Sequence, residues 1–506
     1  MPFLRPKRVH APPTWQKPAP ATAETGAEPP PPHAQWAGTI GALFGLLVTA
    51  FTLSGGQSSS LARYAAIGTG ISLAASVLID LRGGARNLIR ADVMAIAAFY
   101  FLTFFEFLFP QEMFDQMLEP AATRTGVHTV LIGFAGLLIG RHLLRPKQRP
   151  LVRILQHEVP PGWLIAILWV SCFIGYAHMA LAVNFDLVDM VLWMMEPRFS
   201  QPWTRGRFGD WKALIVELGL FIYLLPPLAG IALARRNRFS FLQLAGVVAV
   251  LALTLFYGFT SGTRNVFASY LVTFIIGYAF ALPQDRWKEL VVLSAGGMIL
   301  LMVATVMMLR FRNIGFNNWL AGSERESRVS VENSVFVDYN LCVIGRLTEV
   351  FPSHAAYLGW QVPYLALIRP IPRAVWPGKP EGLTASIENA VGANVGVSVA
   401  ASFAGEAYMA GGWFAVFVAG LFFGGLNGWW SHLASPRNSE LGILIYSSGF
   451  FAAVISMRSL FVFTTALLPT VAALVVTTMA LRHIAARTRL WLTRAARTPR
   501  RPPPRR

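Results

Sequence analysis

Long apolar segments separated by short polar loops run through most of this chain. Twelve such segments can be drawn, at residues 36–53, 61–80, 92–110, 125–143, 162–184, 211–233, 241–260, 263–283, 288–309, 411–431, 440–457 and 459–481. A helix needs about 20 apolar residues to cross the hydrocarbon core, where every backbone polar group must be bonded inside the protein. The pattern predicts an all-α fold, a polytopic integral membrane bundle of about 12 transmembrane helices.

The composition agrees with this fold class. Hydrophobic residues make up 54% of the chain and charged residues 13%, whereas soluble domains carry about 25% charged residues. The net charge of +18 needs no nucleic-acid partner, because membrane proteins gather Lys and Arg in their cytoplasmic loops. Cys172 lies in an apolar segment and Cys342 in a long loop, so the two cysteines predict neither a disulfide framework nor a metal site.

Five regions follow from the segments. Residues 1–35 hold ten prolines and predict a disordered cytoplasmic tail. Residues 36–309 contain spans one to nine, residues 310–410 form a large outer loop, residues 411–481 contain spans ten to twelve, and residues 482–506 form a basic cytoplasmic tail. With both termini in the cytoplasm, most of the 43 Lys and Arg residues fall inside, as the positive-inside rule requires.

The large outer loop has structure of its own. Apolar residues at helical spacing over 330–351 predict an amphipathic helix that lies on the membrane or over the bundle, and residues 355–368 predict a second helical piece. A segment with four prolines follows, Arg369-Pro-Ile-Pro-Arg-Ala-Val-Trp-Pro-Gly-Lys-Pro380. Because each proline fixes φ and removes a donor, this segment is stiff and presents Arg369, Arg373 and Lys379 at set spacings. These three cations lie on the predicted outer side, against the positive-inside rule. One explanation is that long loops cross the membrane regardless of charge. The other is an anionic ligand at the outer face.

Ionisable side chains within spans are costly and mark functional layers. In the predicted topology they gather in the outer third of the membrane, and the inner half holds nothing comparable beyond Asp80. Members of this outer layer are Glu106, His178, Glu217, Arg264, Arg310, Arg312 and Glu406. Each alone is explained by an interfacial or locally paired side chain. Arg264 differs, since Ser261-Gly-Thr-Arg264 is a polar break where helix N–H groups and a guanidinium suit phosphate oxygens.

Several catalytic motifs are missing from the sequence. There is no G-x-x-x-x-G-K-[ST] loop for a nucleotide, no zinc-ligand spacing and no G-x-S-x-G elbow. The first outer loop, residues 54–60, contains no acid. No internal repeat is visible, which disfavours a secondary transporter.

Residues 260–430 resemble one family, the bacterial oligosaccharide repeat-unit polymerases of the Wzy type. The resemblance rests on Ser261-Gly-Thr-Arg264, the segment Ile371-Pro-Arg-Ala-Val-Trp-Pro-Gly-Lys-Pro380, and Gly405-Glu-Ala-Tyr408 before a Gly-rich span. Ala410 and Gly411 depart from the Asn and Phe that members of the family often have. The first five spans match only as apolar helices.

The resemblance implies a membrane glycosyltransferase, similar in architecture to GT-C enzymes, that uses no nucleotide sugar and no cofactor. It would join undecaprenyl-pyrophosphate-linked oligosaccharides at the outer face of the bacterial inner membrane, building O-antigen, capsule or exopolysaccharide. Its partners would be these lipid-linked substrates, the bilayer, a chain-length regulator and a flippase.

Site roles follow from this chemistry as hypotheses. Cations would hold the developing charge of a lipid pyrophosphate leaving group; the candidates are Arg264, Arg310, Arg312, Arg369, Arg373 and Lys379. Glu406 is the first candidate for the base, with Glu381 and His354 behind it. Glu217 would pair with an arginine of the layer or contact substrate, and Trp376 and Tyr408 would stack on sugars or pack the loop.

Three other functions fit the sequence less well. A ligase that transfers finished glycan from the same lipid would share the cationic outer layer. A polysaccharide or lipid-carrier transporter would line a path of charges through the whole bilayer, which the expected bare inner half opposes. A scaffold for a synthesis complex remains the fourth alternative.

Overall fold

The computed structural model describes residues 33–144, 149–157, 160–197, 200–203, 215–283, 286–312, 314–322, 340–373, 375–380, 382–383, 387–388, 390, 400–435 and 438–497. Every regular element in these residues is a helix. The predicted tail up to residue 32, residues 330–339 of the predicted amphipathic helix and the alternative base Glu381 lie outside the described residues.

Each of the twelve predicted segments contains a helix. The helices are α1 (Trp36–Phe51), α2 (Ser58–Leu81), α3 (Ala91–Thr103), α5 (Pro120–Gly140), α7 (Pro161–Ala182), α10 (Leu225–Ala234), α11 (Phe241–Thr260), α12 (Arg264–Ala281), α13 (Trp287–Phe311), α18 (Ser402–Ser431), α19 (Glu440–Arg458) and α21 (Leu468–Arg497). In the described part of the chain, ten helical segments are long and apolar enough to cross a membrane. The helices α1 and α3 are shorter, with 16 and 13 residues. The predicted polytopic bundle is confirmed.

Short helices connect or cover these elements. They are α4 (Phe114–Met117), α6 (Arg149–Gln156), α8 (Leu187–Met194), α14 (Phe316–Leu320), α15 (Asn340–Val350), α16 (Gln361–Ile368) and α20 (Phe463–Ala466), with 3-10 turns η1 (Ala85–Ile89), η2 (Phe105–Leu108), η3 (Glu217–Leu224), η4 (Arg236–Arg238) and η6 (Leu460–Val462). The elements η6 and α20 form the first part of predicted span twelve, ahead of α21.

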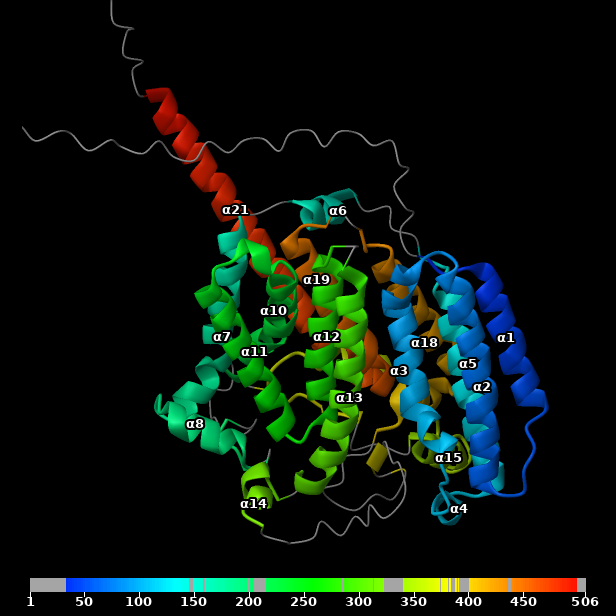
Figure 1. Cartoon of the computed structure of the whole chain (residues 1–506). Coiled ribbons are helices and arrows are strands. Elements are labelled where there is room, and N and C mark those ends of the chain that lie inside the picture. The colour runs from blue at the N-terminus through cyan, green and yellow to red at the C-terminus, as the bar shows by residue number, and fades with distance from the viewer. Residues whose placement is uncertain are drawn as a thin grey trace, which may run out of the picture. The chain divides into compact units, whose positions relative to one another are not determined.

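The described helices bury two large apolar cores. One core is built by α1, α2, α3, α5 and α18 with α15 and α16, and the other by α7, α10, α11, α12, α19 and α21. Figure 1 shows the first group beside α18 and the second around α10 and α12. The helix α19 packs on both α3 and α12 and so joins the two cores.

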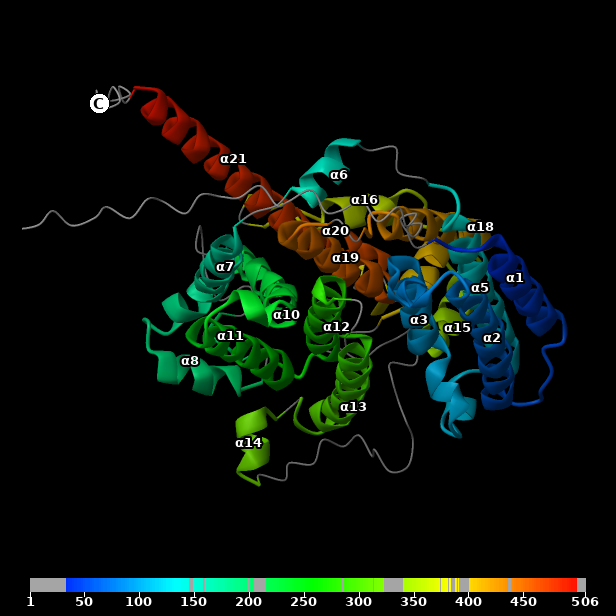
Figure 2. The same cartoon turned by 45° about the horizontal axis from the view of Figure 1, so that its top comes forward.

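Glycines hold α5 and α18 in direct backbone contact, and both views place the two helices side by side (Figures 1 and 2). A Cβ on Gly424 would lie 2.3 Å from the carbonyl oxygen of Leu137, and one on Gly140 would lie 2.5 Å from that of Leu421. Small residues three or four apart allow this approach between membrane helices, where van der Waals packing drives association. We call this contact the glycine seam; it comprises Gly133, Gly136, Gly140, Gly420, Gly424 and Gly428.

The helix α18 is kinked where the sequence predicted its span to begin. Gly411 is extended, and Gly412 has φ +64°, a left-handed conformation that favours glycine. The kink frees backbone carbonyls, and the N–H groups of Leu358 and Gly359 donate to the oxygens of Met409 and Ala410 at 2.8 and 3.0 Å. The predicted loop residues 405–408 are therefore helical, forming a buried first segment of α18.

Span six changes its helical form at two prolines. Residues Glu217–Leu224 form a 3-10 helix, and Pro226 and Pro227 stand in the first turn of α10. Proline lacks an N–H and crowds the preceding turn, which explains why the helical form changes at this point.

The predicted amphipathic helix of the outer loop packs over the bundle. Its described part is α15, which is buried from Asn340 to Ile344 and at Leu347. Asn340 Nδ2 donates to the carbonyl of Leu102 at 2.9 Å, and Gly345 lies against Gly126 of α5. Of the two predicted positions, on the membrane or over the bundle, the structure has the second.

Substitution of Gly424 by alanine tests the glycine seam. The new Cβ would force α5 and α18 apart, and overpacking of this kind costs about 1–3 kcal/mol. We expect a lower thermal unfolding midpoint in detergent, followed by tryptophan fluorescence. Gly296→Ala is the control, because that Cβ meets no atom within 4 Å and alanine favours helix. Equal midpoints for the two variants would contradict the seam.

Candidate functional site

Glu406 lies buried in the first segment of α18 and binds the end of α19. Its side chain is 3% exposed. Oε1 accepts a hydrogen bond from the hydroxyl of Ser459 at 2.6 Å, and Oε2 accepts one from the backbone N–H of Phe461 at 2.8 Å. Both oxygens are thus committed to positions 459–461. This geometry suits a residue that positions the 459–461 turn better than the predicted base.

Arg369 stands at the end of α16, next to the same turn. Its guanidinium carbon lies 4.1 Å from the ring centroid of Phe461, a cation–π arrangement. Because the N–H of Phe461 also donates to Glu406, one residue connects the predicted cation and the predicted carboxylate. The structure therefore brings together Arg369 and Glu406, which are 37 positions apart in the sequence.

The other two cations of the proline-rich segment bond within that segment. Lys379 Nζ donates to the carbonyl oxygens of Arg369 and Ile371 at 2.8 and 2.9 Å. Arg373 donates to the carbonyl oxygens of Lys379 and Pro380 at 2.7 and 3.2 Å. Carbonyls beside prolines lack the partners that a helix would supply, so these two cations close the loop on itself.

The two aromatic candidates pack inside the protein. Tyr408 is buried, its hydroxyl lies 3.5 Å from the carbonyl of Phe351, and its ring meets Tyr357 edge-on. Trp376 is half-buried against the first core. Two roles were predicted for these rings, stacking on sugars or packing the loop. The contacts of Tyr408 are packing contacts.

Arg264 begins α12 at the predicted polar break. Gly262 has φ +62°, and a Cβ there would lie 3.2 Å from Cα of Arg312, so the break packs on the end of α13. The next residue, Asn265, accepts from Nε and Nη1 of Arg458 at 2.9 and 3.2 Å with its amide oxygen toward the guanidinium. The end of α19 thus joins this turn to Ser459 and Glu406. Arg310 is exposed on α13.

A cavity of about 540 Å³ lies beside the Ser261–Arg264 break. Its walls combine aromatic rings with polar groups; they include Glu217, His178, Gln201, Ser261, Thr263, Thr465, Tyr223, Tyr257 and Tyr270. Gly219 leaves room for His178, since a Cβ there would lie 3.0 Å from Cε1 of the imidazole. Concave sites with a few placed polar groups are where small molecules bind. Glu217 lines this cavity; Glu406 does not.

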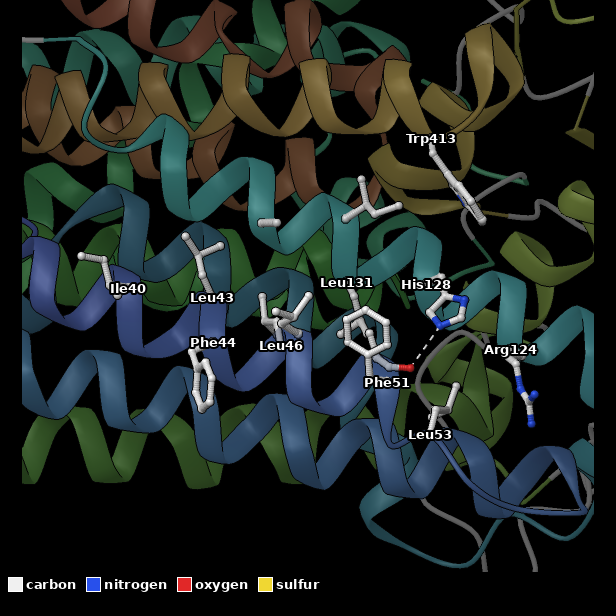
Figure 3. A pocket seen from close by; sticks show the side chains of 14 residues that line it. Ile40, Leu43, Phe44, Leu46, Phe51, Leu53, Arg124, His128, Leu131 and Trp413 are labelled. Atoms are coloured by element: carbon white, nitrogen blue, oxygen red, sulfur yellow. Dashed lines mark hydrogen bonds between the residues drawn. The ribbon is translucent and has the colours of Figure 1, made fainter.

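A second hollow of about 890 Å³ lies between α1 and α5 (Figure 3). Its walls are apolar except for Arg124 and His128 at one end. His128 Nε2 lies 3.4 Å from the carbonyl oxygen of Ala50. This groove holds no carboxylate and is separate from the cavity at Glu217.

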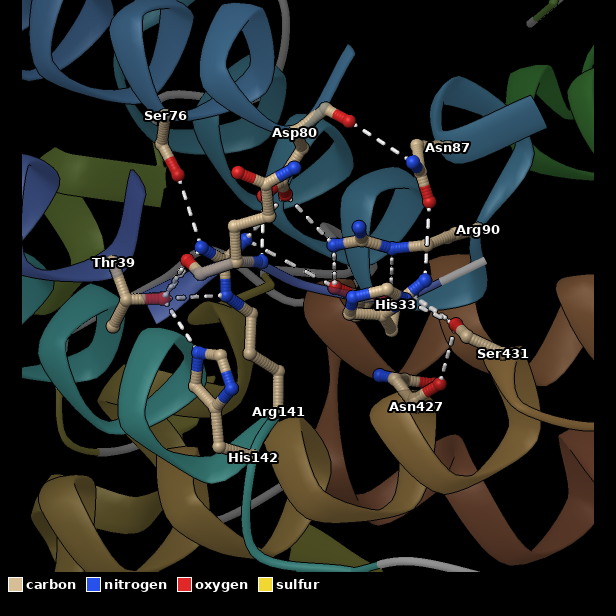
Figure 4. Close-up of polar contacts among 12 residues, drawn as sticks. His33, Thr39, Ser76, Asp80, Asn87, Arg90, Arg141, His142, Asn427 and Ser431 are labelled. Carbon is tan, nitrogen blue, oxygen red and sulfur yellow. Dashed lines mark hydrogen bonds and ion pairs between the residues drawn. The ribbon is translucent and has the colours of Figure 1, made fainter. Parts of the chain in front are cut away.

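Four buried charges meet at the opposite end of the helices (Figure 4). Arg90 bonds Asp80 and Asp92 at 2.9 and 2.7 Å, and Arg141 bonds Asp80 at 3.2 Å. All four side chains are at most 2% exposed. We call this the buried charge network. Its charges sum to zero, and the ion pairs and hydrogen bonds offset part of the large desolvation cost of burying them.

Polar side chains extend the network to neighbouring helices. Ser431 donates to Asp92 at 2.8 Å, and Arg141 donates to Ser76 at 3.0 Å and to Thr39 at 3.0 and 2.6 Å. The network therefore ties together α1, α2, α5 and α18 at one level, beside the start of α3.

The expectation of a nearly bare inner half was wrong. The network lies at the end where α2 and α5 finish and α3 begins, which is the predicted inner end. A second cluster at this end joins Glu440 to Arg235 and Arg238 at 2.9 and 3.1 Å. The sequence placed these cations in loops, although Arg90 and Asp92 flank a span start and Asp80 ends a span. Opposite charges at adjoining span ends were the signal that could have found the network.

Comparison with known proteins finds no matching family model, no matching curated protein and no matching solved structure. The resemblance to repeat-unit polymerases stays a prediction.

Substitution of Ser459 by alanine tests the Glu406 turn. The change leaves Oε1 of a buried carboxylate without its hydroxyl donor, at a cost of about 1–3 kcal/mol. We expect a lower unfolding midpoint by tryptophan fluorescence. Ser60→Ala, at an exposed position, should leave the midpoint unchanged. A Ser459→Ala midpoint equal to wild type would show that this bond does not stabilise the fold.

The neutral imidazole of His142 gives a pH prediction. Thr39 Oγ1 accepts twice from Arg141 and lies 2.6 Å from Nε2 of His142, so the hydroxyl proton is available to an unprotonated Nε2. Burial, and then the charge of Arg141, lower the pKa of His142 to about 4. Because the unfolded chain binds a proton nearer pH 6.5, this group's contribution is present above pH 6.5 and is lost as pH falls toward 4.

We expect His142→Phe, which keeps a ring against Trp36, to reduce the fall in unfolding midpoint between pH 7 and pH 5. The measurement is thermal unfolding across that range. His354→Gln, at an exposed position, should retain the wild-type slope. An unchanged slope in His142→Phe would rule out the assigned pKa.

Proposed function

We propose that this chain polymerises undecaprenyl-pyrophosphate-linked oligosaccharide repeat units at the outer face of the bacterial inner membrane. It would act as a membrane glycosyltransferase without a nucleotide sugar, in the synthesis of O-antigen, capsule or exopolysaccharide. The observation that carries the proposal is the cavity lined by Glu217. It lies next to the Ser261–Arg264 break and to the 459–461 turn that Arg369 and Glu406 contact.

The reaction needs a base, a place for a sugar and cations for phosphate. The acceptor hydroxyl loses its proton to the base, and its oxygen bonds to the anomeric carbon of the donor. The bond from that carbon to the pyrophosphate oxygen breaks, and its electron pair leaves with the lipid pyrophosphate. No redox partner or nucleotide enters this balance.

Glu217 is our assignment for the base. Glu217 lines the cavity, whereas Glu406 does not. A general base must reach the proton that it removes, which favours the cavity residue. Glu406 would then act as a positioning residue that fixes the turn and, through Phe461, Arg369.

Arg264 and Arg312 are our assignments for the pyrophosphate. The first turn of α12 presents N–H groups and a guanidinium beside Thr263 and Ser261, which line the cavity. Gly262 brings the backbone of Arg312 to this break. Donors placed where negative charge develops lower the barrier. Arg373 and Lys379, bonded to carbonyls within the loop, would shape the cover of the site.

A lipid-carrier or polysaccharide transporter is the second candidate, and one observation favours it. The buried charge network supplies charges at the predicted inner end, which the transporter hypothesis requires and the sequence did not reveal. Its charges are mutually paired, however, and this suits a fixed tie between helices better than a path for an anion. A ligase would share the outer layer and differ in its product.

The decisive experiment deletes the gene and examines the length of the surface glycan. We expect single repeat units in place of long chains. Complete polymer accumulating on the lipid carrier would indicate a ligase, repeat units retained at the inner face would indicate a transporter, and unchanged long chains would refute the proposal.

Variants in the complemented strain then test the residue roles. We expect Glu217→Gln to lower polymer formation about 10²- to 10⁴-fold, as loss of a general base does, and Arg264→Gln to lower it about 10²-fold or more. Membrane levels should stay at wild type by immunoblot. Arg63→Gln removes an exposed cation of α2 and should polymerise normally. Normal polymer from Glu217→Gln would refute its role.

A further inference from the structure

We propose that the groove between α1 and α5 binds one acyl chain of a bilayer phospholipid, with an anionic headgroup at Arg124. The groove is a site apart from the cavity at Glu217, and the proposal does not depend on the proposed function. Its occupant follows from the length, lining and charge of the groove.

Packing of α1 against α2 opens the groove. Gly38, Gly45 and Gly68 bring these two helices together, with Ser76, Ser72 and Thr49 as their neighbours. The start of α1 is fixed to the end of α5 by Thr39, which bonds Arg141. Toward the other end, large side chains of α1 and α5 stand apart and leave the volume of about 890 Å³.

The length of the groove matches one leaflet. Its lining runs from Arg124 to Ala135 on α5 and from Ile40 to Phe51 on α1, about 16 Å along each helix at 1.5 Å per residue. Half of a hydrocarbon core of about 30 Å is about 15 Å. One acyl chain of one leaflet therefore fits, whereas a polyprenyl carrier is much longer than the groove.

The chemistry changes along the groove as it does along a lipid. Figure 3 shows Ile40, Leu43 and Phe44 toward one end and Arg124 and His128 toward the other. The exposed guanidinium of Arg124 can bind a phosphate through paired N–H donors, and Trp413, which also lines the groove, is a residue type typical of the headgroup level. An anionic phospholipid complements this pattern.

Native mass spectrometry of the purified, delipidated full chain tests the site. The chain is titrated in detergent with phosphatidylglycerol, phosphatidylcholine or undecaprenyl phosphate. We expect phosphatidylglycerol to bind most tightly, with one high-affinity copy per chain. Tighter binding of undecaprenyl phosphate would overturn the proposal, and so would equal binding of phosphatidylcholine.

Matched variants locate the site. Arg124→Gln should weaken phosphatidylglycerol binding about tenfold, since bonds to charged groups contribute that much, and Arg63→Gln on α2 should not. Ala135→Phe should fill the groove and abolish the high-affinity copy, whereas Ala295→Phe, at an exposed position on α13, should not. Wild-type binding in either Arg124→Gln or Ala135→Phe would overturn the proposal. If Ala135→Phe fails to fold, Arg124→Gln alone decides.

Discussion

Backbone contact between α5 and α18 sets the geometry at both ends of the helices. Since lipid tails are as apolar as the side chains they replace, close van der Waals packing must hold these helices together. A glycine on one helix meets a carbonyl oxygen of the other at Gly136, Gly140 and Gly424, so the two helices have one register. That register places Arg141 beside Gly428 at one end. At the other end, beyond the kink in α18, Glu406 accepts a hydrogen bond from Ser459 at 2.6 Å.

The charged residues at the two ends of the helices have different surroundings. At the end with Arg90, two cations and two carboxylates neutralise one another. Breaking one member would leave an uncompensated buried charge, so this network locks helices. At the other end, Glu217 borders a cavity together with Ser261 and Thr263 of the polar break.

The helical fold and the places of its apolar helices along the chain could be predicted from the apolar segments, because span length and backbone bonding leave few alternatives. The break at Ser261–Arg264 and the change at Pro226 were also predictable, since Gly and Pro alter the backbone locally. Partners could not be predicted. Arg90 meets Asp80 and Glu406 meets Ser459 only because distant spans pack together, and no local pattern encodes that packing. The same applies to Lys379 and Arg373, whose bonds depend on how the loop folds back.

The kink in α18 connects these observations. The helix is interrupted at Gly411 and Gly412, so the carbonyl oxygens of Met409 and Ala410 accept hydrogen bonds from the N–H groups of residues 358–359. That segment leads into α16 and Arg369, which stacks on Phe461, whose N–H returns to Glu406 on α18. These contacts therefore start from α18 and return to α18. Val462 and Thr465, which follow Phe461 in the chain, line the cavity at Glu217. The segment that carries Arg369 is therefore connected to the wall of the cavity through Phe461.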